Sequence, residues 1–231
     1  MDAVTQNIVA LVAVYALIGV TLALCILYSK RHPDKSIRKI IHIMIGNFVF
    51  VWWMFTDPWI MEIFFIIPFA VLILYSVIKE KNSTVVDRAV KEGSRTGLLF
   101  YVISIGILVA LLFGHFAAAS AGILAMTYGD CMGSVIGKRW GKHRTINGKS
   151  LEGSLAVFVF SAAAAFAVLT FYSFLIAGGY YSGDVTGIIP IWAMCIIAGA
   201  VSAVLELLVP GDFDNLAVPL GTAATLCLLG L

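Results

Sequence analysis

Charged residues are scarce in this sequence. Asp, Glu, Lys and Arg make up 12% of its 231 residues, hydrophobic residues make up 61%, and the mean hydropathy is +1.01. A soluble domain has roughly 25% charged and 45–50% apolar residues. The composition therefore excludes a water-soluble globular fold. Several apolar runs approach the roughly 20 residues that a helix needs to cross a bilayer.

Cysteine is also scarce, and no pattern joins its four positions. Cys25, Cys131, Cys195 and Cys227 are scattered, and three of them lie inside apolar runs. This spacing excludes a disulfide framework and a zinc site. The chain also lacks sequence repeats and any segment long enough for a separate soluble module. We expect one integral membrane domain over residues 1–231 and no nucleic-acid partner.

The apolar runs predict an all-α, polytopic bundle of about seven to eight transmembrane helices. The runs are residues 7–28, 40–56, 59–78, 97–113, 116–137, 153–177, 188–209 and 216–231.

The basic residues lie in alternate loops between these runs. All 15 Lys and Arg residues fall around the loops that follow the first, third and fifth runs. The positive-inside rule places these loops in the cytosol and the N-terminus outside, and the turn at 210–215 is then cytosolic as well. Since nearly all charge gathers on one side, we expect the active site on the cytosolic face.

A glycine pattern marks the strongest candidate site. Gly129, Gly133, Gly137 and Gly141 recur every four residues, with Asp130 beside them at the expected membrane edge. On a helix they form a bare stripe, which allows close approach either by another helix or by a phosphate. Both interpretations remain open from the residues alone.

A second motif follows at the start of the sixth run. In Gly148-Lys149-Ser150, helix N-terminal amides, an ammonium and a hydroxyl can together hold an anion, which favours a polyphosphate site. A Walker A loop would need glycine at position 143, where His143 stands. A soluble-type P-loop kinase is therefore excluded.

Several acidic residues lie near the same membrane edge. Glu152 is in the first turn of the sixth run, Glu206 is at the end of the seventh, and Asp214 and Asn215 follow in the turn, where Asp212 is expected to be solvated. A carboxylate at membrane depth is costly, which indicates a function. Carboxylates beside a basic pocket suit Mg²⁺, and we predict Asp130 and Glu206 as its ligands.

The second run opens with Arg38, Lys39 and His42. These residues are about one helical turn apart, so all three can face one cytosolic pocket. The alternative is that the cations only flank a membrane span and the histidine packs against a neighbouring helix.

Five short motifs follow one another between about residues 36 and 220. They are Arg38-Lys39-x-x-His42, Arg95-x-Gly97, Gly129-Asp130-x-x-x-Ser134-x-x-Gly137, Gly148-Lys149-Ser150-x-Glu152-Gly153, and Glu206 with Asp214-Asn215-x-x-x-Pro219. In this order and spacing the chain resembles the CTP-dependent polyprenol kinase family, which includes dolichol kinase, phytol kinase and a CTP-using diacylglycerol kinase.

The resemblance implies transfer of the γ-phosphate of CTP to the hydroxyl of a membrane isoprenoid alcohol of the dolichol, phytol or geranylgeraniol type, giving the lipid monophosphate and CDP. By the same resemblance, the predicted catalytic residues are Asp130, Glu206 and Asp214. The predicted nucleotide-binding residues are Arg38, Lys39, His42, Arg95, Gly129, Ser134, Gly137, Lys138, Gly148, Lys149, Ser150, Glu152, Gly153 and Asn215.

Two other functions are kept as alternatives. A phosphatidate cytidylyltransferase also uses CTP in a membrane, but the His-Gly-Gly signature of that family does not occur here. A transporter would also contain intramembrane acids and glycine-interrupted helices, but here the charges cluster at one face rather than at the midplane. The oligomeric state stays open, with a homodimer as one alternative.

The distribution of Lys and Arg predicts the topology. Single cysteines placed at positions 35, 88 and 144 should react with a membrane-impermeant thiol reagent from the cytosolic side alone. Labelling of any of the three positions from outside would reject this topology and move the expected active site to the other face.

Overall fold

The computed structural model describes residues 2–32, 37–79, 85–91 and 96–231. Within these residues the elements are helices, and one isolated β-bridge joins Arg144 to Ser150. The all-α prediction is confirmed. The chain divides into two compact units, unit 1 (Met1–Ala110) and unit 2 (Leu111–Leu231). The expectation of one membrane domain over residues 1–231 stays a prediction.

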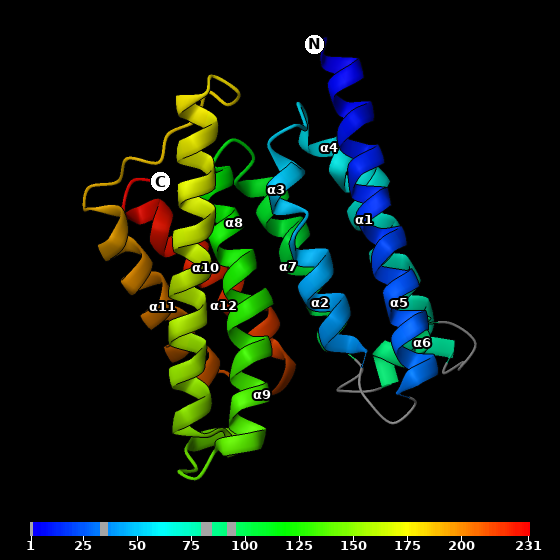
Figure 1. Ribbon diagram of the computed structural model, residues 1–231, viewed down its shortest axis with the longest axis vertical. Coiled ribbons are helices and arrows are strands. Elements are labelled where there is room, and N and C mark those ends of the chain that lie inside the picture. The colour runs from blue at the N-terminus through cyan, green and yellow to red at the C-terminus, as the bar shows by residue number, and fades with distance from the viewer. Residues whose placement is uncertain (1, 33–36, 80–84, 92–95) are drawn as a thin grey trace. The chain divides into compact units, whose positions relative to one another are not determined.

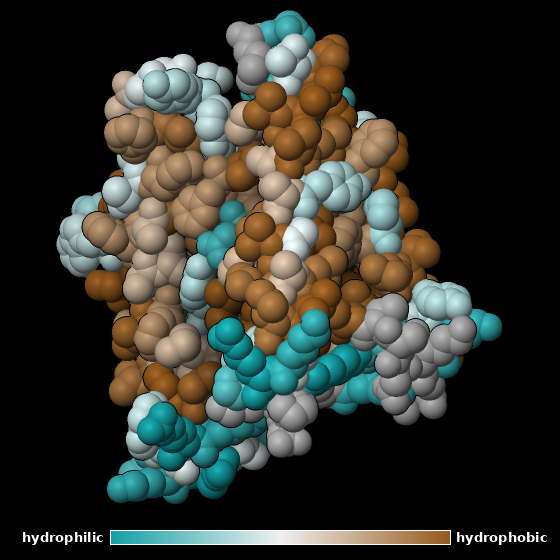
Figure 2. Space-filling view, turned by 45° about the vertical axis from the view of Figure 1, so that its right-hand side comes forward, coloured by the Kyte–Doolittle hydropathy of each residue, from teal (hydrophilic) through white to brown (hydrophobic). Residues whose placement is uncertain are grey.

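Four of the described helices are long and apolar enough to cross a membrane. They are Ala3–Arg31, Pro58–Lys79, Leu151–Ala177 and Ile191–Leu208, and the shorter helix Gly97–Leu111 is apolar as well. Figure 2 shows a face that is hydrophobic over most of its area, with hydrophilic side chains gathered mainly along its lower edge. Helices suit a lipid environment because they satisfy every backbone N–H and C=O group within the segment. The number of spans and their orientation stay predictions.

Unit 1 consists of helices and one π-helical segment (Figure 1). These elements are α1 (Ala3–Arg31), α2 (Arg38–Gly46), α3 (Val49–Trp52), α4 (Pro58–Met61), the π-helical η1 (Glu62–Ile66), α5 (Ile67–Lys79), α6 (Val85–Lys91) and α7 (Gly97–Leu111).

Helix α1 is fixed at its start by two polar side chains. The Asp2 carboxylate accepts a hydrogen bond from the Thr5 N–H, at 2.9 Å, and so caps the helix. The Asn7 amide binds both the side chain and the backbone of Thr56, at 2.6 and 3.0 Å. These bonds place the start of α1 beside the segment that leads into Pro58.

The second apolar run, 40–56, is not one continuous helix. Helix α2 ends at Gly46 and α3 covers only Val49–Trp52. Between them, the Asn47 side chain donates to the Ile43 carbonyl, at 2.6 Å. Such a local side-chain bond competes with the regular helical pattern, and the backbone turns here.

Unit 2 consists of closely packed helices and two short 3₁₀ turns. Its elements are α8 (Phe116–Leu124), the π-helical η2 (Ala125–Asp130), α9 (Cys131–Trp140), the 3₁₀ turn η3 (Ile146–Gly148), α10 (Leu151–Ala177), α11 (Ile191–Leu208), the 3₁₀ turn η4 (Gly211–Phe213) and α12 (Asp214–Leu228). α8, η2 and α9 follow one another without a break, and Figure 1 shows them running alongside α10. α11 packs on α10 and on α12, and α12 also packs on α8.

Small residues bring these helices close together. A Cβ atom added at Gly129 would collide with the Ser161 hydroxyl, and one at Gly133 would collide with Val157 and lie 3.1 Å from the Gly153 carbonyl. Glycine is therefore required for the observed distance between η2, α9 and α10. Gly129 and Gly133 of the glycine stripe are therefore helix-contact residues.

Gly133 tests this packing. Gly133→Leu must push α9 away from α10, and overpacking of this kind costs about 1–3 kcal/mol. We expect a clearly lower thermal midpoint in detergent. The control is Gly19→Leu on α1, where a Cβ atom meets nothing within 4 Å. Equal midpoints for the two variants would contradict the close approach.

Candidate functional site

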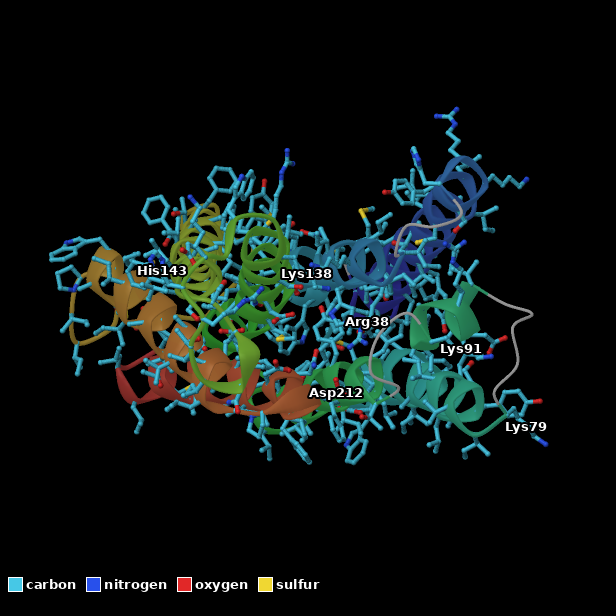
Figure 3. All side chains as sticks on the ribbon, turned by 90° about the horizontal axis from the view of Figure 1, so that it is seen from below. Arg38, Lys79, Lys91, Lys138, His143 and Asp212 are labelled. Carbon is cyan, nitrogen blue, oxygen red and sulfur yellow. The ribbon has the colours of Figure 1, made fainter. Side chains whose placement is uncertain are left out.

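A cavity of about 300 Å³ opens where α9 and α10 meet the α11–α12 turn of unit 2. Figure 3 looks onto this end, with Lys138 and His143 on the α9–α10 side and Asp212 at the α11–α12 turn. Most of the unit 2 residues that were predicted from the sequence line the cavity. They are Asp130, Ser134, Gly137, Lys138, Gly148, Lys149, Ser150, Gly153, Glu206 and Asp214.

One wall of the cavity is a single face of α9. Asp130 ends the π-helical segment η2, and Ser134 and Lys138 follow at intervals of four residues. Residues at this spacing lie one above another on a helix, which explains why all three line the cavity. π-Helical segments are frequent at functional sites, and this one positions a carboxylate.

A second part of the lining comes from the loop that joins α9 to α10, residues 141–150, which contributes Arg144, Gly148, Lys149 and Ser150. Asn147 and Gly148 have left-handed backbones, with φ of 56° and 71°, a conformation that glycine and asparagine tolerate best. An antiparallel bridge then pairs Arg144 with Ser150. The reversal of direction brings Lys149 into the interior of unit 2, where its side chain is only 18% exposed.

Lys149 binds two carboxylates on different helices. Its ammonium lies 3.0 Å from Glu206 Oε1 and 3.2 Å from Asp214 Oδ2, and it also donates to the Glu206 backbone carbonyl. The second Glu206 oxygen accepts from the Ser154 hydroxyl, at 3.4 Å. Lys149 therefore joins the start of α10 to the end of α11 and the start of α12.

Asp214 is held by the residue that follows it. The Asn215 amide donates to Asp214 Oδ1, at 2.9 Å, and to the Asp212 carbonyl, at 3.2 Å. Burial raises the pKa of the Asp214 carboxyl above its ordinary value, although the nearby Lys149 ammonium opposes the shift. A carboxylate with a raised pKa is a stronger base than a solvated one, which suits a proton acceptor.

The α10 N-terminus has fewer amides for an anion than the sequence suggests. The Leu151 N–H donates to the His143 carbonyl at 2.9 Å, and the Gly153 N–H donates to the Ser150 hydroxyl at 3.1 Å. Since these donors are engaged, the side-chain cations around the cavity become the main groups for binding an anion.

Three lining residues were not predicted as site residues. Gly133 and Ser154 face the cavity from α9 and α10, and Arg144 lines it while donating to the Gly148 carbonyl at 3.1 Å. Ser154 lies one helical turn after Ser150, so the helical period could have identified it. The position of Arg144 depends on how the loop folds back, so its spacing in the sequence could not predict that it lines the cavity.

Three predicted residues of unit 2 lie outside the cavity lining. Gly129 packs against Ser161, and the Asn215 amide donates to Asp214 Oδ1. Glu152 pairs with His143 instead, with 2.7 Å between Oε1 and Nδ1.

The other predicted residues belong to unit 1. Arg38 and Lys39 begin α2, and the buried His42 ring stacks on Tyr101, with 4.5 Å between ring centroids. His42 Nε2 is buried, and it has no hydrogen-bond partner among the described residues. Arg95 lies outside the described residues. The nucleotide contacts expected of these residues stay predictions.

The donor set of the cavity fits a divalent cation together with phosphates. Asp130, Glu206 and Asp214 all line it, and carboxylate oxygens are the ligands that Mg²⁺ prefers. Among the described residues no three His, Cys, Asp or Glu side chains form a closed metal cluster. Mg²⁺ often needs only one or two carboxylates when a substrate supplies phosphate oxygens.

Comparison with known proteins gives two similar enzymes. Phytol kinase of Synechocystis is 32% identical over 201 residues, which cover 83% of this chain and 78% of that enzyme. CTP-dependent diacylglycerol kinase 1 of Schizosaccharomyces pombe is 30% identical over 145 residues, which cover 62% of this chain and 64% of that enzyme. No protein-family model and no solved structure matches the chain.

Asn147 gives a direct test of the loop. Its side chain donates to the Leu207 and Leu208 carbonyls, both at 3.2 Å, at the end of α11. Asn147→Ala loses these bonds and also places alanine in a left-handed backbone, which costs roughly 1–2 kcal/mol. Asn147→Gly loses only the bonds. Thermal unfolding in detergent should therefore rank wild type, Gly and Ala in decreasing stability. An alanine variant as stable as the glycine variant would contradict the loop conformation.

Proposed function

The chain belongs to the CTP-dependent lipid kinase family that includes phytol kinase, and we propose that it transfers the γ-phosphate of CTP to the hydroxyl of a membrane isoprenoid alcohol. The products are the lipid monophosphate and CDP. The acceptor is of the dolichol, phytol or geranylgeraniol type.

The observation that carries this proposal is the charge of the cavity. Lys138, Arg144 and Lys149 line it together with Asp130, Glu206 and Asp214. The cations suit the phosphates of a nucleotide, and the carboxylates suit a divalent cation and a proton acceptor. Phosphoryl transfer needs mainly positioning and charge stabilisation, and both kinds of group are present in one cavity.

In the proposed reaction the alcohol oxygen attacks the γ-phosphorus of CTP. The bond from this phosphorus to the β–γ bridging oxygen breaks, and CDP leaves. The alcohol proton passes to a carboxylate, for which Asp130 is the first candidate and Asp214 the second. Mg²⁺ would be held by Glu206 together with whichever of Asp130 and Asp214 does not take the proton, and it would neutralise charge on the phosphate oxygens.

The position of the cavity suits substrates from two phases. α10 and α11 are long enough to cross a bilayer, and the cavity lies at the start of α10 and the end of α11. A lipid hydroxyl in the headgroup region and a nucleotide in water can meet there. The basic residues of the neighbouring loop favour the cytosolic face.

Diacylglycerol is a second candidate acceptor, because the Schizosaccharomyces pombe relative is a diacylglycerol kinase. Purified protein should be given γ-labelled CTP with farnesol, geranylgeraniol, phytol, dolichol or diacylglycerol in turn. We expect label in the monophosphate of an isoprenoid alcohol. Transfer to diacylglycerol alone would change the acceptor class, and transfer to no lipid would reject the function.

Asp130→Asn separates catalysis from structure. Asparagine keeps the shape of the side chain and removes its charge, so a helix-capping role would survive the change. A metal ligand or proton acceptor should lose about 100-fold or more in rate. Lipid phosphate formed per minute is the measurement, and Asp212→Asn in the nearby turn is the matched control. Near-normal activity of Asp130→Asn would move the catalytic role to Glu206 or Asp214.

A further inference from the structure

The Lys149 ammonium lies in a set of oxygen atoms that resembles a cation site. Glu206 contributes a carboxylate oxygen at 3.0 Å and its backbone carbonyl, and Asp214 contributes a carboxylate oxygen at 3.2 Å. The Glu206 and Asp214 side chains are only 11% and 13% exposed. Carboxylate and carbonyl oxygens are also the ligands of hard divalent cations.

The charges in this set do not balance. One ammonium faces two carboxylates, so a negative charge remains in a largely buried place. The other oxygens of the two carboxylates accept from Ser154 and Asn215. Asn215 is 4% exposed, and its Oδ1 has no hydrogen-bond partner among the described residues. The arrangement therefore favours additional positive charge near Asp214.

We propose that Lys149 is an exchangeable counter-ion: it neutralises Glu206 and Asp214 in the nucleotide-free protein and moves to the phosphates when nucleotide binds with a divalent cation. This inference rests on the proposed function and adds a step to it. The ammonium and the divalent cation compete for the same oxygens, so neither binds at full strength while the other is present.

The geometry of the site allows the exchange. Lys149 lines the cavity, and its ammonium stands at the end of a flexible four-carbon side chain. The ammonium can therefore move while the loop backbone stays in place. Phosphates attract the ammonium and the vacated carboxylates attract the cation. Each ligand thus removes an obstacle to the other, which is positive coupling between nucleotide and metal.

Lys149→Met tests this competition without any catalytic step. Mn²⁺ binding is measured by electron paramagnetic resonance on the purified full chain, without nucleotide and without lipid. The variant should bind Mn²⁺ more tightly than wild type by at least about 5-fold, a typical lower value for coupled sites. CDP should strengthen Mn²⁺ binding in wild type and do so much less in the variant.

Two controls identify the cause of such a change. Lys138→Met removes a cation from the same cavity, but this lysine is an exposed residue on α9. An equal gain of Mn²⁺ affinity in Lys138→Met would show general electrostatics and reject the exchange. In Lys149→Met with Glu206→Gln the gain should disappear, and its persistence would place the metal elsewhere and also reject the exchange.

Thermal unfolding and lipid phosphorylation are measured separately from Mn²⁺ binding. Lys149→Met should be less stable than wild type, and Mn²⁺ should raise its thermal midpoint more than that of wild type. If the variant does not fold, the wild type alone decides: CDP must strengthen its Mn²⁺ binding, and no effect of CDP rejects the exchange. If the wild type phosphorylates lipid but both proteins bind Mn²⁺ with equal affinity, the proposed kinase function stands and the lysine exchange is rejected.

Discussion

A lysine ammonium shared by two carboxylates is the interaction on which the end of unit 2 depends. Lys149 comes from the loop before α10, Glu206 from the end of α11, and Asp214 from the start of α12. Buried charges are tolerated when opposite charges lie beside them, so these ion pairs stabilise the packing of the three segments in the nucleotide-free protein. The cavity lies where these three segments meet.

The glycine stripe on η2 and α9 packs against α10 and also borders the cavity. Gly129 and Gly133 allow α10 to approach closely. One turn further, Gly137 lies at the cavity, where an added Cβ would come within 2.9 Å of the Ser150 hydroxyl. The same spacing of small residues thus packs α9 against α10 and also places Gly137 at the edge of the cavity, where it still contacts the start of α10 at Gly153.

Hydrophobic runs were sufficient to predict the helical fold, since length and composition decide whether a helix can form in lipid. They could not predict the break at Asn47, where the side chain donates to the Ile43 carbonyl. The π-helical segment before Asp130 has no compositional signal either. Local motifs identified most of the cavity residues in unit 2, because helical spacing determines which side chains share a face.

The sequence motifs could not predict ion pairs between residues that are far apart in the sequence. The sequence places Lys149 beside phosphates, and in the structure it lies between Glu206 and Asp214, 57 and 65 residues away. The choice of partner depends on how residues 141–150 reverse direction through Asn147 and Gly148. Only the folded loop shows that Arg144 also reaches the cavity.

The location of the cavity follows from the cost of charge in a membrane. A charged side chain is most costly at the bilayer centre and less so toward the interface, so six charged residues can gather only near the helix ends. The hydroxyl of a lipid alcohol is confined to the same region, because its chain stays in the hydrocarbon. The free-energy cost of charge keeps the charged residues away from the membrane centre. They therefore lie in the same region as the hydroxyl of the proposed acceptor.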